Sequence, residues 1–237
     1  MSVSTIVVVM NMTFHVFDTQ RGALAATPGI VTSYPGGDTA VRELQPLGAG
    51  LRPVAWNRGG VIDYAALGQW VAFHRNRSAE APVLVAPYLP SARGDHDPTD
   101  DARVAARLTA ATGVAHVVTV DPHSTVWADE ARRGGVAVTP IEAVDLVACG
   151  AAHHPGWAGV VAPDKGARER AGRVASRLGV PLYTAGKQRN PATGKLSGFV
   201  APEGLPEDGR LLVIDDICDG GGTFAGLADS IRASRPQ

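Results

Sequence analysis

An acidic pair followed by a glycine-rich turn is the part of this 237-residue sequence that is best suited to chemistry. Residues 211–224 read LLVIDDICDGGGTF, so Asp215 and Asp216 directly follow an apolar run. Carboxylates suit sugar hydroxyls and a divalent cation, and glycines let backbone N–H groups approach a phosphate closely. We therefore predict a site for a 5-phosphorylated ribose with Mg²⁺. The plainer alternative is a strand–turn–helix in which the glycines serve tight packing.

The turn itself differs from the Walker phosphate loop, because it has no lysine after its glycines and two acids before them. Its backbone and a threonine hydroxyl remain as donors for an anion. The predicted phosphate-binding residues are Asp219, Gly220, Gly221, Gly222 and Thr223.

Three further apolar runs end in polar residues of the same kind. Their sequences are PYLPSARGD at 87–95, VVTVDPHS at 117–124 and GVVAPDKGA at 159–167. Arg93 suits a phosphate or a stacked base, although an exposed loop arginine is often only solvated. His123 suits a metal or a phosphate or is an ordinary surface histidine. Asp164 could share one cation with His123, or it could cap the helix that follows.

Two exposed turns complete the set of candidates. Residues 186–198 hold little apolar content and several turn formers, so we expect a mobile loop that carries Lys187 and Arg189. Cations on a loop that can close suit negative charge developing on phosphates, and a solvated basic loop is the alternative. Tyr34 and Asp38 flank the turn YPGGD and could stack and hydrogen-bond a purine, or form a plain β-turn.

Short strands alternating with helices would position these residues. We expect strands at 5–9, 29–32, 54–57, 83–86, 117–121, 159–162, 182–184 and 211–215, and a further strand at 39–44 in a hairpin-like flap. We expect helices at 64–75, 100–112, 141–150, 167–178 and 224–233. The predicted class is α/β with mostly parallel sheets, and the number of strands favours two similar halves, 1–139 and 140–237.

Composition narrows the class of protein. The net charge of −1 gives no basic surface for nucleic acid. The two cysteines are not spaced for zinc and indicate a reducing compartment. The apolar opening is too short to span a membrane and lacks the features of a signal peptide. We therefore expect a cytoplasmic protein that binds neither nucleic acid nor membrane.

Taken in order, these motifs resemble the ribose-phosphate pyrophosphokinases, also called phosphoribosyl pyrophosphate (PRPP) synthetases. The resemblance runs from about Tyr34 to Phe224 and suggests a divergent, short member. It implies two phosphoribosyltransferase-like domains of type I. It also implies Mg²⁺-dependent transfer of pyrophosphate from ATP to the C1 hydroxyl of ribose 5-phosphate, giving PRPP and AMP for nucleotide biosynthesis. A homo-oligomer is expected from the resemblance alone.

The resemblance also assigns a role to each candidate. Catalysis falls to Lys187, Arg189 and His123, and ATP binding to Tyr34, Asp38, Arg93, Asp95 and His123. It assigns ribose-phosphate binding to Asp215, Asp216 and residues 219–223, and metal binding to His123, Asp164, Asp215 and Asp216. This chain has Gly220 where the family usually has Thr or Ser, and Gly94 where it commonly has Gln.

Three other readings of the sequence stay open. The acceptor could be a larger 5-phosphoryl ribose such as ADP-ribose, because Gly220 removes a side chain beside the phosphate. A type I phosphoribosyltransferase would consume PRPP with a similar loop. A regulatory homologue would bind nucleotide or a partner without turnover.

Overall fold

The computed structural model describes residues 12–189 and 196–235. The chain divides into two compact units, Met1–Ile141 and Glu142–Gln237. Each unit has its own sheet and its own hydrophobic clusters. The expected boundary, between residues 139 and 140, falls inside a strand, β8 (Ala137–Ile141), that completes unit 1.

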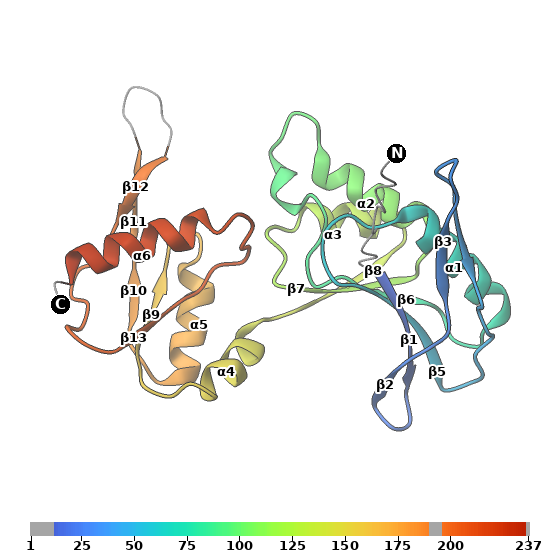
Figure 1. Ribbon diagram of the computed structural model, residues 1–237, viewed down its shortest axis with the longest axis horizontal. Helices are drawn as coiled ribbons and strands as arrows, with labels where there is room; N and C mark the ends of the chain where they lie inside the picture. Colours follow the sequence, from blue (N-terminus) through green and yellow to red (C-terminus); the bar gives the residue numbers. More distant parts are fainter. Residues whose placement is uncertain (1–11, 190–195, 236–237) are drawn as a thin grey trace, which may run out of the picture. The chain divides into compact units, whose positions relative to one another are not determined.

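A six-stranded mixed sheet organises unit 1 (Figure 1). Its strands, in spatial order, are β2 (Ala23–Ala26), β1 (Met12–Asp18), β5 (Leu51–Asn57), β6 (Val83–Val85), β7 (His116–Val120) and β8 (Ala137–Ile141). The strands β5 to β8 are parallel, and β1 is antiparallel to both β2 and β5. The predicted α/β class is confirmed, with two antiparallel strands added at one edge.

Three helices connect the parallel strands of unit 1 and pack against one face of its sheet. They are α1 (Tyr64–Arg77), α2 (Asp101–Ala111) and α3 (Val126–Arg133). The strands follow one another in a single direction, so right-handed crossovers place all three helices on the same side. One hydrophobic cluster accordingly joins Leu84 and Val117 of the sheet to Trp70 of α1 and Trp127 of α3.

A separate hairpin of β3 (Ile30–Ser33) and β4 (Thr39–Arg42) packs on α1. The side chain of Gln69 holds it there. Its Oε1 accepts from the backbone N–H of Val41 at 3.0 Å, and its Nε2 donates to the carbonyl of Thr39 at 2.8 Å. The expected flap is therefore a hairpin anchored to a helix.

Unit 2 is a three-stranded parallel sheet with helices on both faces (Figure 1). Its strands are β10 (Leu182–Thr184), β9 (Trp157–Ala162) and β13 (Arg210–Val213), and its helices are α4 (Val144–Ala152), α5 (Arg168–Leu178) and α6 (Gly222–Ser234). Alternation along β9 divides the core, because successive strand residues face opposite sides. Val160 packs with α5, and Val161 packs with α6.

Several expectations from the sequence are corrected or fall outside the described part. The predicted loop at 186–198 begins and ends in strands, β11 (Gly186–Arg189) and β12 (Leu196–Val200), which pair as an antiparallel hairpin. The elements β1, β2, β8 and α3 were not predicted. The strand expected at 5–9 lies outside the described residues. Within the described part, no helix is long and apolar enough to cross a membrane.

Candidate active site

The glycine turn of unit 2 leads from a buried strand end into a helix. Ile214, just beyond β13, is buried and donates its N–H to the carbonyl of Val161 at 3.0 Å. The helix α6 starts at Gly222, and its first backbone bond runs from Ala225 to the carbonyl of Gly221 at 2.9 Å. The N–H groups ahead of Ala225 lie outside the helix's own ladder and point toward the turn. The positive end of the helix dipole adds to them, so the turn suits an anion.

Only one of the three consecutive glycines is required by the conformation of its backbone. Gly221 has a φ of +72°, in the left-handed region that glycine adopts most readily. Gly220 and Gly222 have no such φ. A Cβ built on any of the three would meet no atom within 4 Å. Tight packing therefore does not explain the glycines, and the outer side of the turn is open to a ligand.

The acidic pair ahead of the turn is electrostatically strained. The Oδ1 atom of Asp215 accepts from the backbone N–H of Asp216 at 3.0 Å. Burial raises the pKa of Asp215, and the neighbouring carboxylates of Asp216 and Asp164 raise it further. A bound cation would relieve that repulsion, so the pair is suited to a metal or to hydroxyl donors.

Asp164 joins this acidic pair from the end of β9. Its Oδ1 atom accepts from the backbone N–H of Ala167 at 3.0 Å, and its Oδ2 atom accepts a short hydrogen bond from Nζ of Lys187. Burial favours the neutral acid, but the bonds from Lys187 and Ala167 outweigh it, so the pKa of Asp164 lies below its usual value. The structure thus brings together three of the predicted motifs, around Asp164, Lys187 and Asp215.

Lys187 reaches this position from β11 and is linked to α6. In the β11–β12 ladder Lys187 lies opposite Phe199, whose carbonyl accepts from the hydroxyl of Ser230 on α6 at 2.9 Å. A Cβ on Gly226 of α6 would come within 2.9 Å of the Phe199 ring, so helix and hairpin are in close contact. Arg189 lies on β11, and its side chain is outside the described part.

The acidic residues of unit 2 suit a magnesium ion that is bound by few protein ligands. No three His, Cys, Asp or Glu side chains converge as a metal cage within residues 12–189 and 196–235. Mg²⁺ is commonly held by one or two carboxylates together with substrate phosphates and water rather than by an all-protein cage. Asp215 and Asp216, whose mutual repulsion favours a cation, match that pattern.

In unit 1 the fold brings two of the predicted segments together. Arg93 and Asp95 lie on a short 3₁₀ helix, η1 (Ala92–Asp95), which follows β6. The side chain of Asp95 is only 6% exposed. Burial favours its neutral form, but a hydrogen bond from Ser124 and the nearby His96 and His123 outweigh it and lower the pKa of Asp95.

Ser124 is a contact that sequence reasoning missed, although it is adjacent to His123. Gly94 also has a local reason, because a Cβ there would come within 2.7 Å of Cβ of Asp101 at the start of α2. A side chain at position 94 would therefore displace the helix. His123 and Asp164 belong to different units, and the cation predicted between them stays a prediction.

The Tyr34–Asp38 turn closes the β3–β4 hairpin. The backbone N–H of Tyr34 donates to the carbonyl of Asp38 at 2.8 Å, and Arg42 donates to the Tyr34 hydroxyl at 2.9 Å. Both Tyr34 and Asp38 are exposed. The plain β-turn is thus present, and an adenine contact at this turn stays a prediction.

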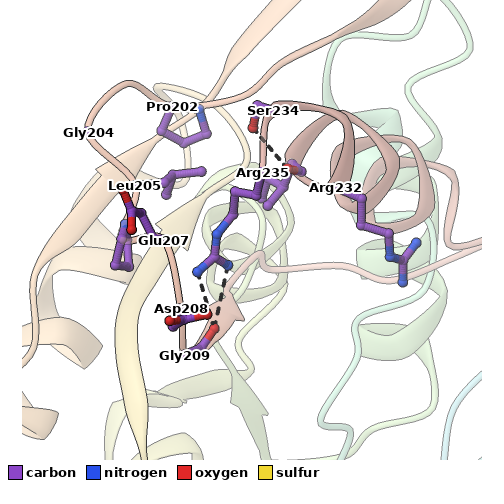
Figure 2. Close-up of a pocket in the computed structure, with 11 residues that line it drawn as sticks. Pro202, Gly204, Leu205, Glu207, Asp208, Gly209, Arg232, Ser234 and Arg235 are labelled. Carbon is purple, nitrogen blue, oxygen red and sulfur yellow. Dashed lines mark hydrogen bonds between the residues drawn. The ribbon is translucent and has the colours of Figure 1, made fainter. Parts of the chain in front are cut away.

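A pocket of about 920 Å³ lies at the opposite end of α6 from the glycine turn. Figure 2 shows Arg235 reaching under Pro202 and Leu205 to the carbonyl of Gly209, at 3.5 Å from each terminal nitrogen. A 13-residue helix is roughly 20 Å long. The pocket is therefore separate from the acidic pair and contains none of the predicted site residues.

Comparisons with known proteins agree with this geometry. Residues 156–237 match the family model described as "Phosphoribosyl transferase domain". The chain is 32% identical over 178 residues to a ribose-phosphate pyrophosphokinase of Methanopyrus kandleri, covering 67% of this chain and 54% of that protein. It is 30% identical over 170 residues to the Hyphomonas neptunium enzyme of the same name, covering 67% and 51%.

The chain is distantly similar to the ribose-phosphate pyrophosphokinases. It spans about half the length of the curated relatives it matches. A solved structure supports the fold across both units. The phosphoribosylpyrophosphate synthetase from Mycobacterium smegmatis aligns with a TM-score of 0.59 and 24% identity, over 88% of this chain and 69% of that one. This alignment confirms the predicted fold, and the similarity to the pyrophosphokinases comes from the curated relatives.

Proposed function

We propose that the protein transfers pyrophosphate from ATP to the C1 hydroxyl of ribose 5-phosphate, with Mg²⁺, giving PRPP and AMP. The observation that carries the proposal is the assembly of Asp164, Lys187 and Asp215 beside the open glycine turn. The similarity to named ribose-phosphate pyrophosphokinases supports it.

Unit 2 would bind the acceptor. The 5-phosphate would accept from the backbone of residues 219–223 and from the Thr223 hydroxyl, at the positive end of α6. Asp215 and Asp216 would accept from the ribose hydroxyls and hold Mg²⁺, with Asp164 beside them. When bound, the metal would neutralise negative charge on these carboxylates and on the substrate phosphates.

Unit 1 would bind the ATP. Arg93 and His123 would donate to the phosphates, Asp95 would keep their segments together through Ser124, and Tyr34 with Asp38 would contact the adenine. The oxygen of the C1 hydroxyl attacks the β-phosphorus and its proton passes to water, while the bond from that phosphorus to the α,β-bridging oxygen breaks, so AMP leaves with both electrons of that bond. Such a loose transfer depends mainly on in-line positioning and charge neutralisation. Lys187 and Arg189 would stabilise the negative charge on the transferring group. A homo-oligomer is part of this proposal.

One observation favours a second acceptor class. Gly220 needs neither a left-handed φ nor close packing, and its missing side chain leaves open space beside the predicted phosphate. That space would admit a substituent on the 5-phosphate, as in ADP-ribose. The pyrophosphate transfer would be the same, and only the acceptor would change.

An acceptor screen tests both alternatives. The protein is incubated with ATP, Mg²⁺ and either ribose 5-phosphate or ADP-ribose, and AMP and the pyrophosphorylated product are measured by mass spectrometry. Product from ribose 5-phosphate supports the first proposal, and product from ADP-ribose alone supports the second. Turnover of a base plus PRPP without ATP would instead identify a phosphoribosyltransferase, and no turnover of any mixture would contradict the assignment as an enzyme of this class.

A further inference from the structure

The ammonium group of Lys187 bonds one of the carboxylates that are predicted to hold the metal. It donates to Oδ2 of Asp164, and the two side chains are 33% and 27% exposed, so the ion pair is partly exposed. The negative charge of Asp164 reaches Asp215, because it contributes to raising the pKa of that group. Lys187 therefore neutralises Asp164, one of the carboxylates that are predicted to bind the metal.

The neighbouring lysine shows that this arrangement is specific. Lys165 directly follows Asp164 in the sequence, yet it is exposed, and its side chain makes no hydrogen bond or ion pair among the described residues. The partner of Asp164 instead comes from a different strand, β11. Geometry and not sequence proximity thus places a cation at Asp164.

We propose that Lys187 and a divalent cation compete for the carboxylate of Asp164, and that Lys187 is released when the metal binds. This inference rests on the proposed function for the metal site and for the contact of the released ammonium group with the ATP phosphates. Before exchange, the ammonium group of Lys187 balances the charge of Asp164. After exchange the metal would balance that charge, and Lys187 would be available.

The physical basis is the difference between the two cations. A lysine ammonium is a point charge on a flexible stem, and a partly exposed ion pair is weak. Mg²⁺ carries twice the charge and prefers carboxylate oxygens. The exchange is therefore favourable, and it requires only the side chain to leave.

The backbone before Lys187 is anchored, so the released side chain remains at the site. Arg168 at the start of α5 donates to the hydroxyl of Thr184 at 3.1 Å, and the N–H of Ala185 donates to the carbonyl of Ala162 at 2.8 Å. Both bonds fix the end of β10, directly ahead of β11.

Metal titration of the protein tests the exchange without any substrate. Mg²⁺ affinity is measured by calorimetry for the wild type, for Lys187→Met, which keeps the aliphatic stem, and for Lys165→Met as the matched control. Because Lys187→Met removes the competing cation, we expect its affinity for Mg²⁺ to rise on the order of 5-fold, the weight of one partly exposed ion pair. The change in Lys165→Met should be less than twofold. Equal or weaker binding by Lys187→Met than by the wild type overturns the proposal.

Chemical labelling gives a second readout in the unmodified site. The acylation rate of the Lys187 amine is followed by mass spectrometry with and without Mg²⁺ at fixed pH. Wild-type Lys187 should react several-fold faster with Mg²⁺, and in Asp164→Asn it should react fast under both conditions. A wild-type rate that does not respond to Mg²⁺ contradicts the exchange. Neither measurement uses ATP or a ribose, so a failed acceptor screen and a failed exchange are separate results.

Discussion

Alanine at Gly220 and alanine at Gly221 should affect the protein in opposite ways, although the two glycines are neighbours. Neither added methyl group meets an atom within 4 Å, so packing does not distinguish them. The backbone conformation distinguishes them, because Gly221 has a φ of +72° and Gly220 has no positive φ. The comparison therefore isolates conformational strain from ligand contact in one turn.

The expected magnitudes reflect that difference. A non-glycine residue held in the left-handed region costs about 1–2 kcal/mol. Gly221 lies in unit 2, Glu142–Gln237, and for a unit of this size each kcal/mol shifts the melting temperature by about 4–8 °C, so Gly221→Ala should lower that of unit 2 by about 4–16 °C. Gly220→Ala should be neutral or slightly stabilising, by up to about 1 kcal/mol, because alanine restricts the unfolded chain.

Thermal unfolding and acceptor kinetics together form the assay. Gly220→Ala should keep the melting temperature and reduce kcat/KM for ADP-ribose more than for ribose 5-phosphate, because the methyl group occupies space that only a substituted phosphate needs. Equal melting temperatures for the two variants would refute the described turn geometry. Equal losses with both acceptors would refute the role given to the space at Gly220.

Three further predictions concern charge and burial. Lys187→Ala should lower kcat by several orders of magnitude with a smaller effect on ATP binding, because the lysine would contact the phosphates mainly in the transition state. Steady-state kinetics and equilibrium binding check this, and an unchanged kcat contradicts it. Asp215→Asn should raise the melting temperature at pH 7. The raised pKa of Asp215 means that its ionised form, beside Asp216, destabilises the folded state above that pKa. The gain should vanish at acidic pH, where the wild-type carboxyl is protonated, and equal melting temperatures at pH 7 argue against the repulsion. Burial lowers the pKa of His74 to about 4, and the His74 ring hydrogen-bonds the Ser78 hydroxyl at 2.7 Å. The free energy of unfolding should therefore fall as the pH drops from about 6.5 toward 4. Urea titrations at pH 7 and 5 should show this fall in the wild type and a smaller one in His74→Gln.

The strands and helices that end at the site could be predicted from the sequence. Apolar runs such as that ending at Ile214 identify buried strands, because a parallel strand is covered on both faces. The glycine turn and the start of α6 were likewise predictable, because the turn formers directly precede a helical pattern. Each of these signals lies within a few neighbouring residues, so the sequence alone was sufficient to predict the element.

The hairpin and the side-chain pairs depended on tertiary structure. The residues GKQR of β11 are polar and give no strand pattern, and their strand exists because β12 pairs with them. The Asp164–Lys187 pair and the Asp95–Ser124 contact join segments that are distant in sequence. Sequence motifs placed Asp164 and Lys187 in one site but could not show that they bond each other.

The contact between Gly226 and Phe199 joins two parts of unit 2 that are distant in the sequence. Gly226 lies in the first half of α6, the helix that starts at the glycine turn, and Phe199 lies opposite Lys187 in the β11–β12 ladder. The glycine turn and the strand that carries the lysine therefore both depend on the packing of this one helix.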